Sequence, residues 1–359
     1  MEELRRHFPS LSNCIYLNTA ANGLVPKSVI EWRRHNDIDL LEQASTFRLH
    51  AKEHIDSVRN SVARFFGASP NETALVSNFS LGINMVLEGL PEGQKILLLK
   101  GDYPSVVCPV ETRDFNVCYA EINENLEGNI ESAIAKHRPD VFIFSIVQWL
   151  SGIKIDLEFV KQLKIDNPNL LVIADGTQYL GTESFNFHES GIDVLGTSGY
   201  KWLTAGFGNG FIMVKEEAQK HIFPRAIGFN SAESFSSDAT ETHFIKHFEP
   251  GHQDTLNFGS LEQSILFVDS MGREKLYDKL SVLSNTAKLY FSEMGLLSNS
   301  ILLRESHSSI FNLKGNDAMF KKLIANNVIC SPRGGGIRVS FHYYNSEADL
   351  NRLVEVLGF

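Results

Sequence analysis

One lysine, Lys201, stands among small residues in the stretch GTSGYKWLTAGFGNGFIMV, which spans residues 196–214. A lysine is usually a solvated surface charge. If this one is buried, its pKa falls and its amine can act as a nucleophile that forms a Schiff base. An acid precedes it by about one crossover unit, because Asp175 ends the apolar run LLVIAD. The pair can therefore share one edge of a sheet, although capping of the next helix is an alternative role for Asp175.

A third element could hold an anion. Residues 73–90, TALVSNFSLGINMVLEGL, place Ser77, Asn78 and Ser80 just ahead of an apolar-periodic helix. The free N–H groups and the positive dipole end of a helix start can bind a phosphate, although ordinary capping also explains these residues. A lysine, an acid and a phosphate cradle together suggest pyridoxal phosphate.

Alternating strands and helices must position these residues. The short apolar runs at 95–100, 141–147, 170–175 and 210–214 are typical of strands that are covered on both faces. Helical patterns at 129–137 and 157–165 lie between them. This order predicts an α/β fold with a largely parallel sheet, and ligands bind such sheets beyond the carboxyl ends of the strands.

The pattern of alternating short strands and helices changes near Gly259. A long helical stretch follows, in which Gly272 marks an expected break, and strand-like and helical segments then alternate to the C-terminus. We expect a second, smaller α+β domain there.

Composition narrows the class of protein. The 359 residues carry a formal net charge of −10 and contain 43% hydrophobic residues, so a large core and a small-molecule ligand are expected rather than a nucleic acid. No apolar run is long enough to cross a membrane, and the N-terminus lacks a secretory h-region. Four cysteines without a CxxC pair favour a reducing, cytoplasmic location.

Eight segments in a common order resemble the class V aminotransferase family of fold type I pyridoxal-phosphate enzymes, which also contains cysteine desulfurases, kynureninases and isopenicillin N epimerase. The segments are YLNTAANGLVP (16–26), FSLGIN (79–84), DYPSVV (102–107), VQWLSGIKIDL (147–157), IADGTQ (173–178), GTSGYKW (196–202), FEPGHQDT (248–255) and IRVSFHYYNSEADLNRLVEVL (337–357). The resemblance implies a mostly parallel, seven-stranded sheet in a large cofactor-binding domain of residues 16–258. It also implies a small α+β domain of residues 1–15 plus 259–359.

The resemblance assigns roles at the cofactor. Lys201 would carry pyridoxal phosphate as a Schiff base and later move the proton at the substrate carbon. Asp175 would keep the pyridine nitrogen protonated, which makes the ring an electron sink. Gln178 would hydrogen-bond the ring oxygen. The other implied cofactor contacts are the amide of Phe79, the side chains of Ser80, Ser198 and Tyr200 at the phosphate, and Trp149; Tyr200 stands where a histidine is common, and a phenol can also donate.

The resemblance also assigns the substrate and a partner subunit. Arg338 would grip the amino-acid carboxylate with its guanidinium fork, beside Asn18 and Ala20, and Arg333 in SPRGGG is a second cation. Tyr103, Trp149 and the loop at 230–242 are expected to line the side-chain pocket. His252 and Gln253 would reach the phosphate pocket of a neighbouring subunit, so a homodimer with shared sites is expected.

Some residues depart from the family pattern. A histidine that often stacks on the cofactor ring is replaced by Ile146, which cannot shuttle protons. Cys330 precedes both Arg333 and Arg338, and only GGGI separates the two arginines, so a nucleophilic cysteine is missing from the expected loop. Cysteine desulfuration is therefore disfavoured.

Other classes of site fit less well. The glycines of GFGNG run into a strand rather than opening a helix, which argues against a dinucleotide-binding oxidoreductase. His50 with His54, and His243 with His247, lack the glutamate of a zinc motif, so no metal site is expected. We predict transamination of an amino acid, with a keto acid as a possible acceptor. A lyase or epimerase of the same family is the alternative, and a cofactor-binding protein without turnover is the alternative from a different class.

Overall fold

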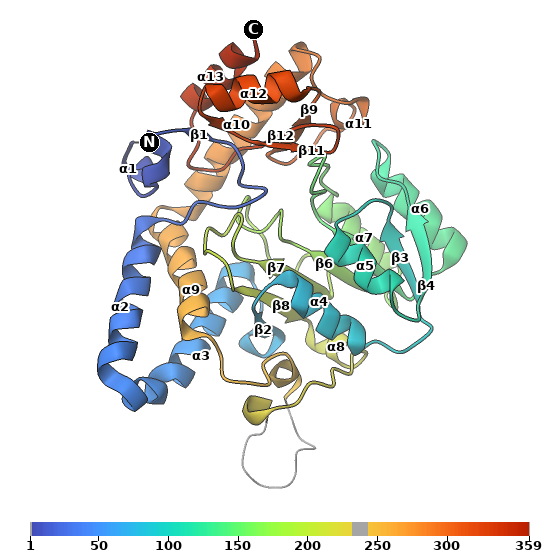
Figure 1. The fold of residues 1–359 in the computed structure, drawn as a ribbon. Helices are drawn as coiled ribbons and strands as arrows, with labels where there is room; N and C mark the ends of the chain where they lie inside the picture. Colours follow the sequence, from blue (N-terminus) through green and yellow to red (C-terminus); the bar gives the residue numbers. More distant parts are fainter. Residues whose placement is uncertain (1, 232–242, 359) are drawn as a thin grey trace.

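The computed structural model describes residues 2–231 and 243–358, and its centre is a seven-stranded sheet. The strand order is β2-β8-β7-β6-β5-β3-β4 (Figure 1). The strands are β2 (Thr73–Val76), β3 (Lys95–Leu99), β4 (Asn116–Ala120), β5 (Val141–Ser145), β6 (Leu171–Asp175), β7 (Val194–Ser198) and β8 (Gly210–Val214).

Six of these strands run in one direction. The neighbours from β4 through β3, β5 and β6 to β7 pair in parallel, whereas β8 is antiparallel to both β7 and β2. The prediction of a mostly parallel, seven-stranded sheet is confirmed. Because β2 points the same way as β7, the carboxyl ends of β2, β3, β5, β6 and β7 lie at one edge of the sheet.

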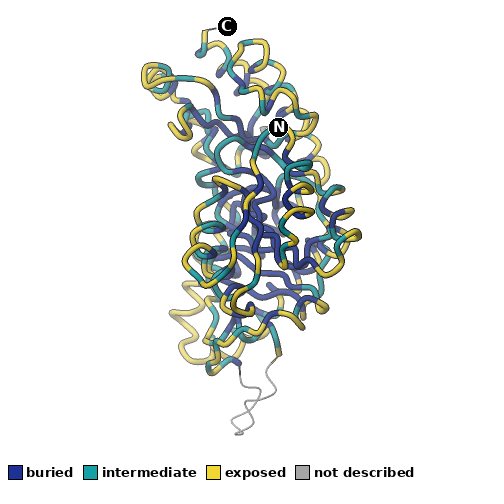
Figure 2. Tube along the Cα trace, turned by 90° about the vertical axis from the view of Figure 1, so that its right-hand side faces the viewer, coloured by how far each residue is buried: buried dark blue, intermediate teal, exposed yellow. Residues whose placement is uncertain are grey.

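Helices cover both faces of the sheet, because the strands carry apolar side chains on both faces. Alternate strand residues pack into two separate hydrophobic clusters, one on each face. Figure 2 shows the buried residues gathered in the middle of the molecule and the exposed residues outside them. One cluster includes α4 (Phe79–Glu88), α5 (Pro104–Glu111) and α8 (Glu216–Gln219); the other includes α3 (Phe47–Phe66), α6 (Leu126–His137), α7 (Leu157–Asp166) and α9 (Thr255–Ser270).

A smaller sheet lies above the carboxyl edge of the large one (Figure 1). It is antiparallel, in the order β11-β12-β9. A two-stranded parallel pair joins β1 (Ile15–Tyr16), from the N-terminal part of the chain, to β10 (Val328–Ile329). The bounds are β9 (Ile310–Leu313), β11 (Ser331–Arg333), β12 (Gly336–Ser340), α10 (Arg273–Glu293), α11 (Asn299–Leu302), α12 (Asp317–Ala325) and α13 (Glu347–Leu357).

The break expected at Gly272 is confirmed. Helix α9 ends at Ser270 and α10 begins at Arg273, with Gly272 between them at φ 82°, a conformation that glycine adopts without strain. The exact domain boundaries stay a prediction. Helix α9 crosses the boundary expected after residue 258, since it packs against α3 and α2 (Lys27–Gln43). At the N-terminus, α1 (Glu2–Arg5) joins the C-terminal part through an ion pair of 2.6 Å between Arg5 and Asp349.

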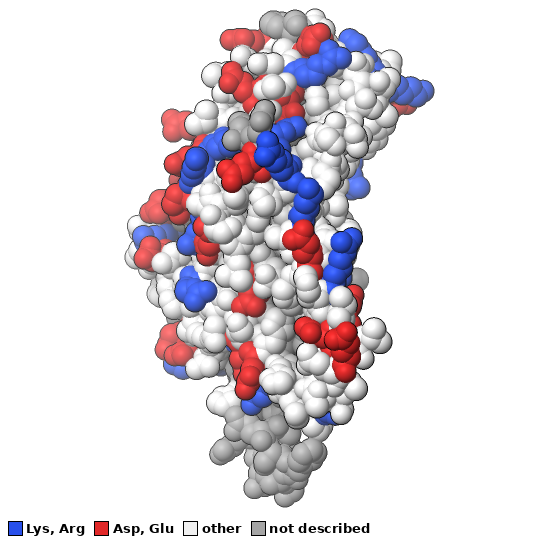
Figure 3. Space-filling model, turned by 90° about the vertical axis from the view of Figure 1, so that its left-hand side faces the viewer, with Lys and Arg blue, Asp and Glu red and all other residues white. Residues whose placement is uncertain are grey.

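On the face shown in Figure 3, lysines and arginines are interspersed with acidic residues and form no continuous basic surface. Among the described residues, no helix has the length and apolarity needed to cross a membrane. Most of the predicted loop at 230–242 lies outside the described residues, which end at Ser231 and resume at His243.

Candidate active site

The candidate residues follow the carboxyl ends of five neighbouring strands. Phe79 and Ser80 come after β2, Tyr103 after β3 and Trp149 after β5. Asp175 ends β6, and Lys201 follows the end of β7. The strand order brings the ends of these strands to one edge of the sheet, where the sequence predicted Asp175 and Lys201 to lie together.

Lys201 is buried, with 5% of its surface exposed. Its Nζ lies 5.4 Å from the ring centre of Tyr103 and 5.5 Å from that of Tyr200. Burial lowers the pKa of the Lys201 ammonium to about 8, and the positive charges of Arg338 and Arg333 contribute, although Asp175 opposes the shift. The amine is therefore partly deprotonated near neutral pH, as a nucleophile or base requires.

Asp175 is buried at the end of β6, with 4% of its surface exposed. One carboxylate oxygen accepts a hydrogen bond of 2.8 Å from the amide of Thr177. Burial raises the pKa of Asp175 to about 6, although the hydrogen bonds from Thr177 and the charge of Lys201 oppose this shift. A buried carboxylate in this state would gain from a cationic ligand.

The amide of Gln178 is fixed from two sides. Its Oε1 accepts a 2.7 Å hydrogen bond from Trp202 Nε1, and its Nε2 donates at 2.9 Å to the backbone oxygen of Ala20. The amide of Ala20 donates to Ser340 Oγ at 2.9 Å. Since a side-chain amide has two N–H donors, one of them remains for a cofactor oxygen. Sequence reasoning missed Trp202, although its position beside Lys201 was a signal.

The start of α4 is capped within the protein. Asn78 accepts a 3.0 Å hydrogen bond from the amide of Leu81, and the amide of Phe79 donates at 2.9 Å to Ser198 Oγ. Ser80 Oγ donates to Ser105 Oγ at 2.8 Å. The structure thus differs from the expectation that the Phe79 amide faces the phosphate directly, because Ser198 already accepts from it. The roles of Phe79, Ser80 and Ser198 at a phosphate stay predictions.

Arg338 reaches the site from the small sheet. Its side chain is buried, and Nη1 donates to the backbone oxygen of Trp149 at 2.6 Å. Burial and the charge of Arg333 lower the pKa of Arg338 to about 10. Asn18 lies nearby on the same sheet, since it bridges to Ser340 and its Oδ1 accepts from Ser331 Oγ at 2.7 Å.

Two aromatic rings lie beside the lysine. The rings of Tyr103 and Trp149 meet edge to face with centres 5.7 Å apart, and Tyr103 also faces Lys201. Ile146, where the resemblance placed a ring-stacking position, is instead fully buried in the hydrophobic core. Tyr103 is therefore the better candidate to pack on a cofactor ring. Next to it, the buried carboxylate of Asp102 accepts from the amides of Tyr103 and Ser145 and so holds this turn in place.

Two predicted residues lie elsewhere in the subunit. His252 and Gln253 line a cavity of about 450 Å³ together with α3 residues such as Arg48 and Lys52. The ring of His252 packs on Phe229 with centres 5.0 Å apart. Their role at a neighbouring subunit stays a prediction. Within the described residues, no group of histidine, cysteine or acidic side chains is arranged to hold a metal ion.

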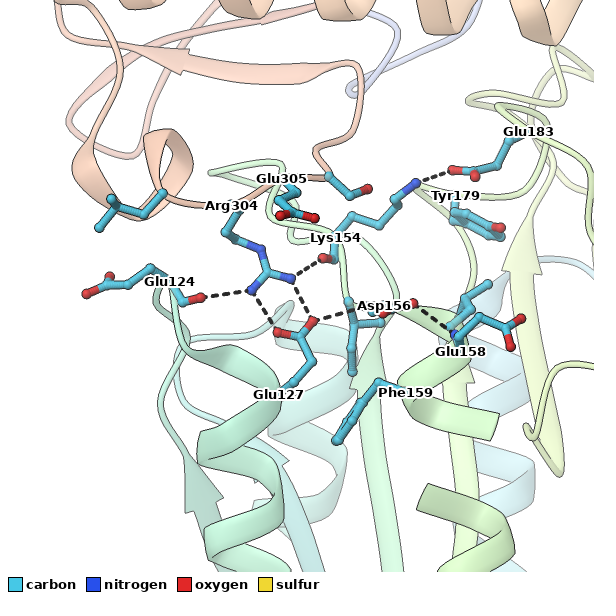
Figure 4. Close-up of a pocket in the computed structure, with 14 residues that line it drawn as sticks. Glu124, Glu127, Lys154, Asp156, Glu158, Phe159, Tyr179, Glu183, Arg304 and Glu305 are labelled. Carbon is cyan, nitrogen blue, oxygen red and sulfur yellow. Dashed lines mark hydrogen bonds and ion pairs between the residues drawn. The ribbon is translucent and has the colours of Figure 1, made fainter. Parts of the chain in front are cut away.

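A second cavity of about 650 Å³ contains none of the candidate site residues (Figure 4). Arg304 crosses it and binds Glu127 through both carboxylate oxygens, at 2.9 and 2.6 Å. Lys154, also in its wall, pairs with Glu183 at 2.7 Å. Most charges in this cavity are thus already paired.

The residues at the sheet edge fit pyridoxal phosphate. A buried amine with a lowered pKa suits its aldehyde, and a buried carboxylate with a raised pKa suits its pyridine nitrogen. Two buried donors there, Arg338 Nε and Trp149 Nε1, have no hydrogen-bond partner among the described residues. Buried donors are rarely left unpaired, so a polar ligand in this space is expected.

Comparisons with known proteins agree with this geometry. The chain is 23% identical to a probable cysteine desulfurase of Methanothermobacter thermautotrophicus, over 99% of this chain and 97% of that protein. It is 21% identical to the uncharacterized aminotransferase YcbU of Bacillus subtilis, with the same coverage.

Solved structures share the fold. The complex of the cystine C-S lyase C-DES with its product cysteine persulfide superposes with a TM-score of 0.86 and 20% identity, covering 98% of this chain and 99% of that one. The apo cysteine desulfurase of Thermococcus onnurineus gives the same TM-score and identity, covering 99% of this chain and 96% of that one. The family model described as aminotransferase class-V matches residues 15–353. The chain therefore belongs to the class V aminotransferase family, which consists of fold type I pyridoxal-phosphate enzymes acting on amino acids.

Proposed function

We propose that this protein is an aminotransferase that acts on an amino acid through Lys201. The observation that carries the proposal is the buried pair of Lys201 and Asp175 at the carboxyl edge of the sheet, with Arg338 above it. When bound, pyridoxal phosphate supplies a carbonyl group for the substrate amine and a ring that accepts electrons. Gln178, Ser198 and Tyr200 are the residues proposed to hold it, together with the start of α4.

Lys201 would move the proton. With its pKa near 8, the free amine can take the proton from the substrate α-carbon near neutral pH and return it elsewhere. The rings of Tyr103 and Tyr200 lie 5.4 and 5.5 Å from Nζ, and only 5% of the surface of Lys201 is exposed to water. Asp175 supports this step, because its buried negative charge stabilises a protonated ring nitrogen. These two groups would serve the proton transfer of transamination.

Arg338 would bind the substrate carboxylate. A planar guanidinium matches a carboxylate with two parallel hydrogen bonds. Its Nη1 contact with the Trp149 backbone holds it in position, while Nε still lacks a partner. Among the described residues, no carboxylate forms an ion pair with it, so an anionic substrate would supply that charge.

A thiol-dependent desulfurase is not supported by the cysteines. Cys330 is buried, and burial raises the pKa of its thiol to about 11, which makes it a poor nucleophile. The loop between Arg333 and Arg338 contains no cysteine. The second candidate is a lyase that cleaves a C–S bond without a protein thiol, which the likeness to the cystine C-S lyase favours.

One assay separates the two candidates. The holoenzyme is incubated with an amino-acid panel and a keto acid, and new keto acid, new amino acid and persulfide are measured. An aminotransferase forms the new amino and keto acids in equal amounts. Persulfide from cystine, without a new amino acid, would identify the lyase. Lys201→Ala should abolish either activity, and Arg338→Lys should raise the KM about tenfold, because a lysine loses the bidentate contact.

The predicted homodimer belongs to the same proposal. His252, Gln253 and the exposed Phe229 lie together at the surface beside α3, where a second subunit could use them. Sedimentation equilibrium tests this, because a monomer that binds the cofactor fully would contradict shared sites. All four cysteines are unpaired, which supports the proposed cytoplasmic location.

A further inference from the structure

Two arginines share one face of the small sheet. Strand β11 pairs antiparallel with β12 so that Ser331 lies opposite Arg338, and Arg333 lies opposite Gly336. Directly opposed residues point to the same face, and so do residues two apart along a strand. Arg333 and Arg338 therefore project from the same side of this hairpin.

That side faces the active site. The Arg338 guanidinium donates to the backbone of Trp149, and Ser331 on the same face binds Asn18. Burial lowers the pKa of Lys201 and the charges of both arginines add to this shift, whereas burial raises the pKa of Tyr200 to about 12 and both arginines oppose that rise. The Arg338 guanidinium thus lies at the active site, and Arg333 projects from the same face of the hairpin.

Neither arginine has an acidic partner. In the parts of the chain that the structure describes, no carboxylate lies within ion-pair distance of either guanidinium. Elsewhere, buried arginines such as Arg59 and Arg304 are paired with glutamates. Arg338 is a buried cation without an ionic partner, and Arg333 adds a second positive charge on the same face, so a ligand with two anionic groups would pair with both.

The hairpin holds Arg333 in a defined place. Asn312 on β9 donates to the backbone oxygen of Arg333 at 3.0 Å. Gly334 has φ 63°, and a Cβ on Gly336 would lie only 2.5 Å from the backbone oxygen of Leu313, so glycine is required at both positions. The turn is therefore built to keep the backbone of Arg333 close to β9 and β12.

The two arginines differ in burial, which suggests a different role for each. Arg338 is buried with 2% of its surface exposed, whereas Arg333 is exposed at the end of the hairpin. We propose that the substrate is an α-amino acid whose side chain carries a second anionic group, with Arg338 binding the α-carboxylate and Arg333 the side-chain group. This rests on the proposed function, because it assigns the substrate class of the same site.

The test compares acids with their uncharged amides. L-Aspartate and L-glutamate are titrated against L-asparagine and L-glutamine, which have nearly the same shape, and the change in visible absorption of the holoenzyme gives each Kd. One of the acids should bind at least about tenfold more tightly than its amide, as expected for one charge-assisted contact. Arg333→Gln should reduce this ratio to about threefold or less, and Arg333→Lys should retain part of it.

A matched control is Arg352→Gln on α13, an exposed arginine that pairs with Glu355 and touches none of the candidate site residues, which should keep the wild-type ratio. Amides that bind as tightly as the acids, or an unchanged ratio in Arg333→Gln, would overturn the inference while leaving the proposed function intact. A holoenzyme whose spectrum responds to no amino acid would contradict the proposed function and this inference together.

Discussion

Burial at the same site shifts the pKa values of Lys201 and Asp175 in opposite directions. Removal from water disfavours the charged form of each, so burial lowers the pKa of the lysine and raises that of the acid. Their mutual attraction opposes both shifts and is weaker than burial. The site therefore leaves a reactive amine beside an acid that is ready to accept a cationic partner.

The pH dependence of cofactor uptake follows from the lysine. Only the neutral amine can attack an aldehyde, so the rate constant for covalent attachment of pyridoxal phosphate should rise with pH and level off above about 8. Stopped-flow absorbance on the apoprotein measures this rate. A solvated lysine would instead give a midpoint near 10.5, its ordinary value.

Lys279 offers a matched control for that measurement. Burial lowers the pKa of its ammonium to about 8 as well, but its Nζ binds the backbone of Tyr343. Lys279→Arg should keep the wild-type pH profile, whereas Lys201→Arg should abolish attachment. Loss of attachment in Lys279→Arg together with normal attachment in Lys201→Arg would show that Lys279, and not Lys201, binds the cofactor.

At the scale of elements, the backbone near residue 23 controls the position of the lysine loop. The amide of Gly23 donates to the oxygen of Tyr200 at 2.9 Å, and a Cβ on Gly23 would lie 1.9 Å from the backbone oxygen of Lys201. A change of side-chain conformation cannot relieve this clash, because the atom that a Cβ would meet belongs to the backbone of Lys201. The N-terminal segment can therefore approach Lys201 only through a glycine.

Gly23→Ala should consequently separate these two segments. We expect a loss of about 1–3 kcal/mol in the unfolding free energy of the apoprotein, as for other overpacked positions, and weaker binding of the cofactor. Urea denaturation and cofactor titration measure the two effects. Gly128→Ala is the control, because its Cβ would meet only the flexible side chain of Asn125. Wild-type values for Gly23→Ala would contradict the predicted clash.

Regular elements were predictable from the sequence to within a few residues. The apolar run at 141–147 contains β5 (Val141–Ser145), and the helical pattern at 157–165 matches α7 (Leu157–Asp166). Continuous apolar runs and 3.6-residue periods carry this information locally. Strand β4 was not predicted, because it lies at the sheet edge and alternates exposed with buried residues.

The detailed contacts of the site were less predictable. The hydrogen bond between Trp202 and Gln178 joins residues that follow different strands, and the approach of Tyr103 to Lys201 depends on the order of β3, β5, β6 and β7. No local pattern encodes such contacts, since they arise only when the strands are assembled. The sequence was enough to identify the candidate residues, whereas their hydrogen-bond and packing partners could be identified only from the folded structure.

At the scale of the whole molecule, Arg304 links the C-terminal part of the chain to the large sheet and its helices (Figure 4). Its guanidinium binds both oxygens of Glu127 on α6 and the backbone oxygen of Lys154. Burial alone would raise the pKa of Glu127, but the hydrogen bonds from Arg304 and from the amide of Asp156 hold it below its ordinary value. The side chain of Arg304 is only 8% exposed, so water screens this contact weakly.

A double-mutant cycle with Arg304→Gln and Glu127→Gln tests this link. Each single variant should lose about 1–3 kcal/mol of unfolding free energy at neutral pH, because it leaves one buried charge without a partner. The pKa of Glu127 is lower in the folded state, so the contribution of the pair is present above about 4.5 and is lost as the pH falls through the folded-state pKa. Thermal and urea denaturation between acidic and neutral pH measure both effects.

The exposed pair Lys100 and Glu121 is the control and should show much weaker coupling. Equal coupling in the two cycles would mean that Arg304 does not join the two parts of the molecule, and that the small sheet carrying Arg338 is held over Lys201 by its other contacts, such as the hydrogen bond from Arg338 to Trp149.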